Sequence, residues 1–94
     1  MPMRYRRACR AVAKEFKMAP EVLLSPTRGR PEQAVARQAF MYVLQTKYNL
    51  SFTEVGRLIG RYRKTVSHGI LQTQRRQGAS KNFSDRIVKI RAAL

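Results

Sequence analysis

The sequence has little acidic charge and almost no cysteine. Five Asp and Glu stand against 20 Lys and Arg, which gives a net charge of +15 over 94 residues. The five carboxylates are scattered, with no acidic pair, nucleophile triad or phosphate-cradling glycine loop, so we expect no enzyme activity. Cys9 is the single cysteine, which excludes an internal disulfide and a zinc finger. We therefore expect neither a metal nor a cofactor.

Long apolar runs are also absent. No segment approaches the length needed to span a bilayer, and the arginine-rich N-terminal stretch lacks the apolar region of a signal peptide. We expect no membrane partner and a chain that stays in the compartment where it is made. Because 94 residues are too few for two domains, residues 1–94 are predicted to form a single domain.

Apolar residues recur at helical spacing instead. Tyr5, Cys9, Val12 and Phe16 are separated by three or four residues, which predicts a first helix with one buried face, ending near Met18. No strand-like alternation competes with this pattern, so the expected fold is all-α with five to six helices. A helical turn is expected at residues 21–24, followed by a basic loop at 26–31 and a longer helix at about 32–48. The next helix is expected to start at residue 52, and the one after it to follow Gly60 and end at about residue 76. A final helix would be capped by Asn82 or Ser80.

A capping box marks the start of one helix. In Ser51-Phe-Thr-Glu54, the Ser51 hydroxyl can accept from the Glu54 amide while the Glu54 carboxylate accepts from the Ser51 amide. This helix is expected to begin at Phe52, and Gly56 would let another helix approach it closely. Gly60 then supplies the turn before a second helix, and residues 77–80 supply the next break. The pattern predicts a helix-turn-helix at about residues 51–76.

The helix-turn-helix carries a strongly one-sided charge. No acidic residue occurs between Glu54 and Asp85, whereas this stretch is rich in arginine and lysine. Such a basic helix pair indicates a nucleic-acid partner, because the second helix of the motif lies in the major groove of double-stranded DNA. The residues expected to lie against DNA at its start are Arg61, Tyr62, Arg63, Lys64, Thr65 and His68.

These residue types suit different contacts. Arg63 or Lys64 can donate to guanine, and the Thr65 hydroxyl can bind a phosphate. The alternatives are a solvated basic turn, a Thr65 hydroxyl that serves its own backbone, and a His68 that packs as an ordinary helix residue. Arg76 is expected to add affinity that does not depend on DNA sequence.

Two further segments are candidates for DNA contact. Arg28 and Arg30 lie in a basic loop that can enter an adjacent minor groove. Arg37 is expected to contact a phosphate, and Gln38 a phosphate or a sugar. The alternatives for these four residues are a solvated loop and the polar face of a helix.

Several of these segments together resemble the C-terminal DNA-binding domain of the bacterial replication initiator DnaA. The resemblance implies a Trp-repressor-like helical fold. It also implies that Arg28 is the family's minor-groove arginine and that Arg37 and Gln38 are the pair at the DNA backbone. Thr65 matches the second threonine of the family's Asp-His-Thr-Thr signature. It covers about residues 8–94 in order, and the matching pieces are Val12-Ala-Lys-Glu-Phe16, Leu23-Leu-Ser25 with Arg28 and Arg30, Ala36-Arg-Gln38 with Met41-Tyr42, Leu50-Ser-Phe-Thr-Glu-Val-Gly56, and Thr65-Val-Ser-His68.

The chain departs from that family at the residues that read bases. Tyr62, Arg63 and Lys64 replace the first three signature positions, one residue is missing from the turn before Arg61, and one is added near Pro31. The substitutions put recognition of the family's own DNA box in question while keeping phosphate affinity. No ATPase module or P-loop is present, so this chain is not an initiator by itself.

Together these features predict a stand-alone protein that binds double-stranded DNA and regulates replication initiation or transcription by site occupancy. It would be cytoplasmic and associated with the nucleoid. The alternative is a module that docks on a replication or transcription protein, motivated by the substituted signature and by Leu71 on the motif helix. RNA binding is a third possibility that Tyr62 alone supports poorly, because it offers only one stacking ring. Target sequence and oligomeric state stay open.

Overall fold

The computed structural model describes residues 1–26 and 29–94. Within these ranges the chain is all α-helical and has no strand, which confirms the expected fold class. None of the described helices combines the length and the apolar character that a membrane crossing requires. The six helices are α1 (Met3–Glu15), α2 (Pro20–Leu24), α3 (Pro31–Tyr48), α4 (Phe52–Ile59), α5 (Arg63–Ala79) and α6 (Lys81–Ala92).

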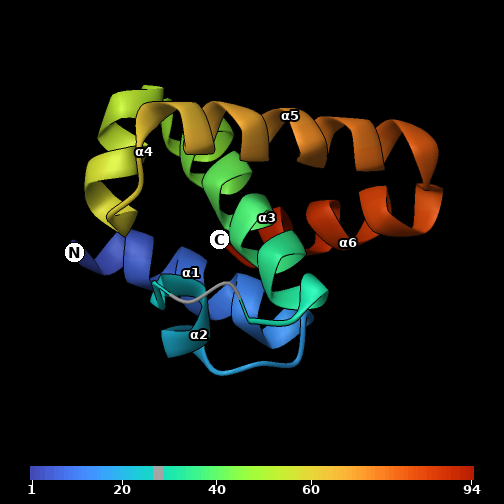
Figure 1. Cartoon of the computed structure of the whole chain (residues 1–94). Coiled ribbons are helices and arrows are strands. Elements are labelled where there is room, and N and C mark those ends of the chain that lie inside the picture. The colour runs from blue at the N-terminus through green and yellow to red at the C-terminus, as the bar shows by residue number, and fades with distance from the viewer. Residues whose placement is uncertain (27–28) are drawn as a thin grey trace.

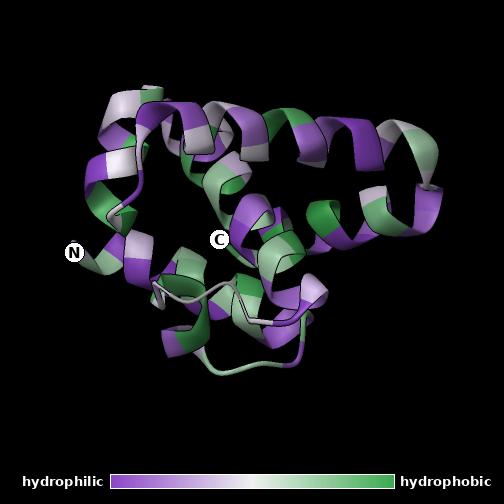
Figure 2. Cartoon of the chain, in the orientation of Figure 1, coloured by the Kyte–Doolittle hydropathy of each residue, from purple (hydrophilic) through white to green (hydrophobic). Residues whose placement is uncertain are grey.

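Helix α3 is the centre of the structure. It runs between α5 on one side and α1 with α2 on the other, and it also packs against α4 and α6 (Figure 1). Hydrophobic and hydrophilic residues alternate along these helices (Figure 2), as expected of helices that each have one face in the core. Phe40, Met41, Val43 and Leu44 on α3 are almost fully buried at the middle of that core.

Helix α1 is shorter than its apolar pattern predicted. Tyr5, Cys9 and Val12 are buried as expected, but the helix ends at Glu15 rather than near Met18. Lys17 adopts a left-handed conformation with φ 56°, and the Met18 amide donates back to the Ala13 carbonyl at 3.0 Å. This backbone bond closes the last turn of the helix.

Phe16, the last residue of the predicted apolar stripe, lies beyond the helix and is only partly buried. Its ring lies near that of Phe83, with centroids 6.4 Å apart, and the Arg86 guanidinium lies 4.2 Å from its centroid. The side chain therefore seals the edge of the core between α1 and α6.

Helix α5 is longer than predicted. It was expected to end near Arg76, but it continues through Gly78 to Ala79, so the break predicted at residues 77–80 is reduced to Ser80. Ser80 alone separates α5 from α6. Its amide donates to the Arg76 carbonyl at 2.9 Å and its hydroxyl accepts from the Phe83 amide at 3.1 Å, so one residue ends one helix and caps the next.

Candidate nucleic-acid interface

The predicted capping box is present at the start of α4. The Ser51 hydroxyl accepts from the Glu54 amide at 3.1 Å, and the Glu54 carboxylate accepts from the Ser51 amide at 3.0 Å. The bond from the Ser51 amide is the main cause that lowers the pKa of the Glu54 carboxyl. Because this carboxylate is ionised at neutral pH, the cap holds the entry of the helix-turn-helix in place.

The turn between α4 and α5 folds tightly back onto α4. Gly60 takes a left-handed conformation with φ 69°, and the Arg61 amide donates to the Gly56 carbonyl at 2.9 Å. A methyl group on Gly56 would lie 2.5 Å from the Arg61 carbonyl oxygen. Gly56 was expected to let a neighbouring helix approach, and Val66 of α5 does lie 3.7 Å from the position of that methyl group. The closest approach, however, is by the backbone of the turn itself.

Close packing of α5 on α3 depends on a different glycine. A methyl group on Gly69 would lie 2.7 Å from the Met41 sulfur and 3.1 Å from Cγ of Gln38. Val66 and Ile70 are buried beside Gly69. This face holds α5 against the core, so its opposite face and its N-terminal end are left to solvent.

Helix α5 begins at Arg63, so Arg61 and Tyr62 belong to the turn. Tyr62 is 86% exposed although it is aromatic. Arg63 extends over the Phe52 ring, 5.9 Å from its centroid, a cation–π contact that restricts the guanidinium. The polar residues exposed along this end of α5 are Arg63, Lys64, Thr65 and His68.

The N-terminus of α5 has no anionic or polar cap of its own. No side chain caps the helix, and its first turn contains no acidic residue. Unpaired amides and the helix dipole make such an end favourable for a phosphate. Thr65 lies here with its side chain exposed, so its hydroxyl is available to an external ligand.

Arg61 connects the turn to the segment before the basic loop. Its Nη2 donates to the Ser25 carbonyl at 2.5 Å, and its Nη1 donates to the Gly60 carbonyl at 3.4 Å. The sequence predicted Arg61 as a DNA contact, with a solvated basic turn as the alternative. Part of its guanidinium instead joins two segments that are 36 residues apart.

Arg37 has a similar role within the protein. Only 8% of the residue is exposed, and it donates from Nε to the Leu23 carbonyl at 3.1 Å and from Nη2 to the Val22 carbonyl at 3.2 Å. Burial, followed by repulsion from Arg61, lowers the pKa of the Arg37 guanidinium. The predicted phosphate contact therefore falls on a side chain that holds the end of α2 against α3.

We expect Arg37→Leu to lower the free energy of unfolding by about 1–3 kcal/mol, because the carbonyls of Val22 and Leu23 would each lose a guanidinium donor. Urea unfolding gives the change, and amide hydrogen exchange at residues 20–24 should become faster. An unchanged stability together with weaker binding to duplex DNA would contradict the structural role and favour the phosphate contact.

Gln38 and Arg76 form a pair across α3 and α5. Arg76 Nη1 donates to Gln38 Oε1 at 2.5 Å, and both side chains are partly buried. Arg76 was expected to contact DNA irrespective of sequence, yet this bond uses one of its donors within the protein. Arg75, its neighbour, is exposed and better placed for such a contact.

A groove with a volume of about 650 Å³ lies between α3 and α5. It brings together candidate residues that the sequence placed on α3, on α5 and in the turn between α4 and α5. Thr65, whose side chain is exposed, and the residues next to the uncapped start of α5 line it, which suits the groove for an anion. The residues that line it are Pro26, Ala34, Arg37, Gln38, Met41, Arg61, Thr65 and His68.

The remaining predicted residues lie around this groove or outside the described chain. Arg30 is exposed at the start of α3, where its amide donates to Gln33 Oε1 at 3.0 Å. Gly29 precedes it with φ 63°, and the same Gln33 oxygen occupies the space of a methyl group there. Arg28 lies outside the described residues.

Sequence reasoning missed two contributors to this surface. Arg57 is exposed on α4 and borders a hollow of about 480 Å³ with Thr53, Tyr62 and Arg63. Phe52 supports Arg63 as described above. A signal for Arg57 was present, since it lies in the acid-free stretch, but only the packing of α4 beside the turn shows that it faces the same side.

Comparison with known proteins points to one family. The family described as the bacterial dnaA protein helix-turn-helix matches residues 7–72. The chain is 33% identical over 85 residues to the chromosomal replication initiator protein DnaA of Thermomicrobium roseum, covering 89% of this chain and 18% of that protein. The protein of the same name from Ureaplasma parvum is 35% identical over 65 residues, covering 68% of this chain and 14% of that protein. The chain thus spans less than a fifth of the length of these relatives.

Proposed function

The chain belongs to the helix-turn-helix family of bacterial DnaA proteins, and on this premise we propose that it binds double-stranded DNA through the N-terminal end of α5. By occupying its sites it would regulate replication initiation or transcription. The observation that carries this proposal is the exposed, uncapped and acid-free start of α5, where Arg63, Lys64 and Thr65 lie in consecutive positions. A major groove accepts a helix end of this kind and displays a distinct pattern for each base pair.

Individual side chains have different parts in this proposal. Lys64 is exposed, and no hydrogen bond or ion pair among the described residues involves its side chain, so it can extend to a base edge. Arg63 is held over Phe52 and contacts either a guanine or the adjacent phosphate. Thr65 and the amides at the start of α5 bind a phosphate, and Arg30 approaches the neighbouring minor groove from the other side of the motif.

Lys64→Ala is expected to change the preferred DNA sequence, because it removes a side chain that reads base edges. Arg75→Ala is the matched control, since it removes one exposed cation from the same helix at a position suited to phosphate. Competition binding with a panel of duplexes should show discrimination at one base position relaxed by about 1–3 kcal/mol for Lys64→Ala. Arg75→Ala should weaken every duplex by a similar factor. Uniform weakening by both variants would mean that α5 positions the protein without reading bases.

The DNA sequence itself is best found by selection from a random duplex pool at near-physiological salt. We expect an enriched motif that differs from the box recognised by the family, because Tyr62, Arg63 and Lys64 replace three signature residues. If no motif is enriched, the protein binds the phosphate backbone without reading the base sequence.

A second candidate function is docking on a replication or transcription protein, which one observation favours. Leu71 is 42% exposed and lines a hollow on α5 with Phe52 and His68. Exposed apolar groups beside polar ones are common at protein interfaces. A pull-down after nuclease treatment distinguishes the two functions, because a partner that is retained without DNA, and lost with Leu71→Ser, supports docking.

A further inference from the structure

A second basic surface lies on α1, which the proposed DNA contacts do not use. We call it the α1 basic surface. Its members on the helix lie away from the buried Tyr5, Cys9 and Val12, and one further member, Lys17, follows just after the end of the helix. All of them are exposed: Arg6, Arg7, Arg10, Lys14 and Lys17. Arg6, Arg10 and Lys14 are spaced four residues apart and so form one line along the helix.

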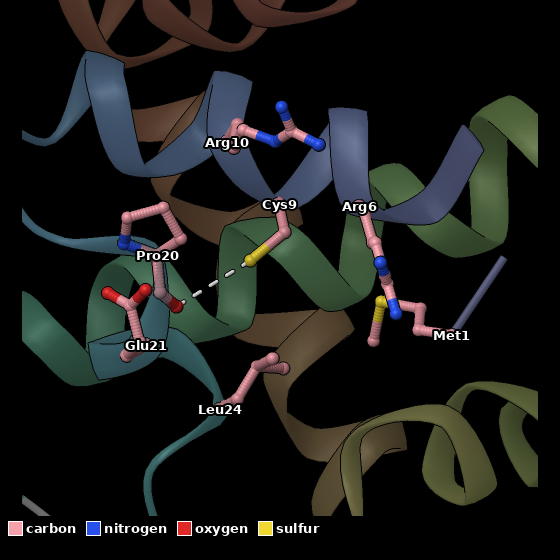
Figure 3. Close-up of a pocket in the computed structure, with 7 residues that line it drawn as sticks. All are labelled: Met1, Arg6, Cys9, Arg10, Pro20, Glu21 and Leu24. Atoms are coloured by element: carbon pink, nitrogen blue, oxygen red, sulfur yellow. Dashed lines mark hydrogen bonds between the residues drawn. The ribbon is translucent and has the colours of Figure 1, made fainter. Parts of the chain in front are cut away.

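Carboxylates do not neutralise this surface. Among the described residues, the ion pairs join Glu15 to Arg86 and to Lys89, at 3.4 and 3.6 Å, and none involves a member of the α1 basic surface. Glu21 on α2 borders a hollow with Arg6 and Arg10. Figure 3 shows that the only hydrogen bond among the residues lining this hollow joins Cys9 to the Pro20 carbonyl.

The arrangement is unfavourable for the helix itself. Cations four residues apart repel each other, and the first turn of α1 contains no acidic residue to offset the positive end of the helix dipole. Burial does not require these side chains either, since they are exposed. A local pattern that opposes folding without a packing benefit indicates a ligand that neutralises it.

The position of this surface decides which ligand it fits. Helix α3 lies between α1 and α5 (Figure 1). The buried residues of α1 pack toward α3, and the members of the α1 basic surface are exposed, so this surface and the start of α5 lie on opposite sides of α3. A single duplex held at α5 therefore leaves it free, and a line of three cations with hydrogen-bond donors suits the evenly charged phosphates of another duplex.

We propose that the α1 basic surface binds the phosphate backbone of a second DNA duplex, so that one molecule joins two segments of DNA. This inference rests on the proposed function, because the first duplex is held by α5. Binding at α1 would depend little on sequence, since it involves phosphates rather than base edges. The protein would then bring distant DNA sites together in addition to occupying one of them.

The test is a bridging experiment with two duplexes. One duplex is immobilised and saturated with protein, unbound protein is washed away, and capture of a second, fluorescent duplex is measured. The parent should capture it, and Arg10→Gln/Lys14→Gln should capture about tenfold less at near-physiological salt while saturating the immobilised duplex equally. Lys47→Gln/Lys81→Gln is the matched control, because it lowers the net charge equally at exposed positions on α3 and α6. This control should capture as the parent does.

The outcomes separate the possibilities. If the unsubstituted protein saturates the immobilised duplex but captures no second duplex, the inference is overturned and the proposed function stands. If the unsubstituted protein does not bind the immobilised duplex, the proposed function is contradicted. Equal capture by parent and Arg10→Gln/Lys14→Gln would mean that bridging arises from protein self-association, which sedimentation velocity would then detect. If that variant lost binding to anionic vesicles but kept capture, the surface would belong to a membrane and the inference would fail.

Discussion

Raising the salt concentration from about 50 to about 200 mM is expected to weaken duplex binding by about 1,000-fold. The reason is the net charge of +15 and the concentration of exposed cations around the start of α5. Each phosphate that the protein neutralises releases a condensed counterion, so affinity falls with the salt concentration raised to a power set by the number of contacts. For about six phosphates, the logarithm of the affinity plotted against the logarithm of salt should have a slope near −5.

Fluorescence anisotropy with a duplex short enough for one protein molecule measures this slope. The Arg75→Ala variant should reduce its magnitude by about 1, because it removes one phosphate contact. Binding that is independent of salt, or absent from a duplex at low salt, contradicts the proposed function. It would leave docking on another protein as the better explanation of the exposed surface.

Gly56→Ala is expected to lower the free energy of unfolding by about 1–3 kcal/mol. The added methyl group would lie 2.5 Å from the Arg61 carbonyl oxygen, and a backbone atom cannot move aside as the end of a flexible side chain can. The turn must open, which displaces Arg61 and the start of α5. For a domain of this size the melting temperature should fall by about 4–8 °C per kcal/mol, and binding to DNA should weaken as well.

Gly78→Ala is the control for this substitution and should have the opposite sign. Gly78 lies within α5, its φ is not positive, and no atom lies within 4 Å of an added methyl group. Alanine at such a helix position stabilises by about 0.5–1 kcal/mol. Chemical denaturation of both variants checks the pair. If the Gly56→Ala protein is as stable as the unsubstituted protein, the turn accommodates the added methyl group without opening, and the predicted clash with the Arg61 carbonyl oxygen is contradicted.

Local sequence signals predicted the helices well where a cap or an apolar stripe marks them. Ser51 and Glu54 placed the start of α4 correctly, because a capping box is a contact between near neighbours. Gly78 misled the prediction of the end of α5, since a single glycine weakens a helix by only about 1 kcal/mol and the packing of α5 against its neighbours outweighs that loss. Lys17 ended α1 early through a backbone conformation that no apolar spacing reveals.

The sequence predicted which side chains of the candidate site are exposed better than it predicted which are bound within the protein. Lys64 and Thr65 are exposed as the motif required, because a helix buried on one side presents its other side to solvent. Arg37 and Arg61 are bound to carbonyls 14 to 36 residues away. Such partners are brought together only by the complete fold, so charge patterning could not distinguish a DNA contact from an internal anchor.

The anchors formed by Arg37 and Arg61 have one more consequence. They hold the end of α2 and Ser25 against α3 and the turn. Helix α3, which begins just after Arg30, packs along α5, so the geometry between Arg30 and the start of α5 is set by the protein. DNA that engages both must adapt its own curvature to that geometry. Under the proposed function, base pairs between these two contacts would be selected for how easily they bend, which favours pyrimidine–purine steps there.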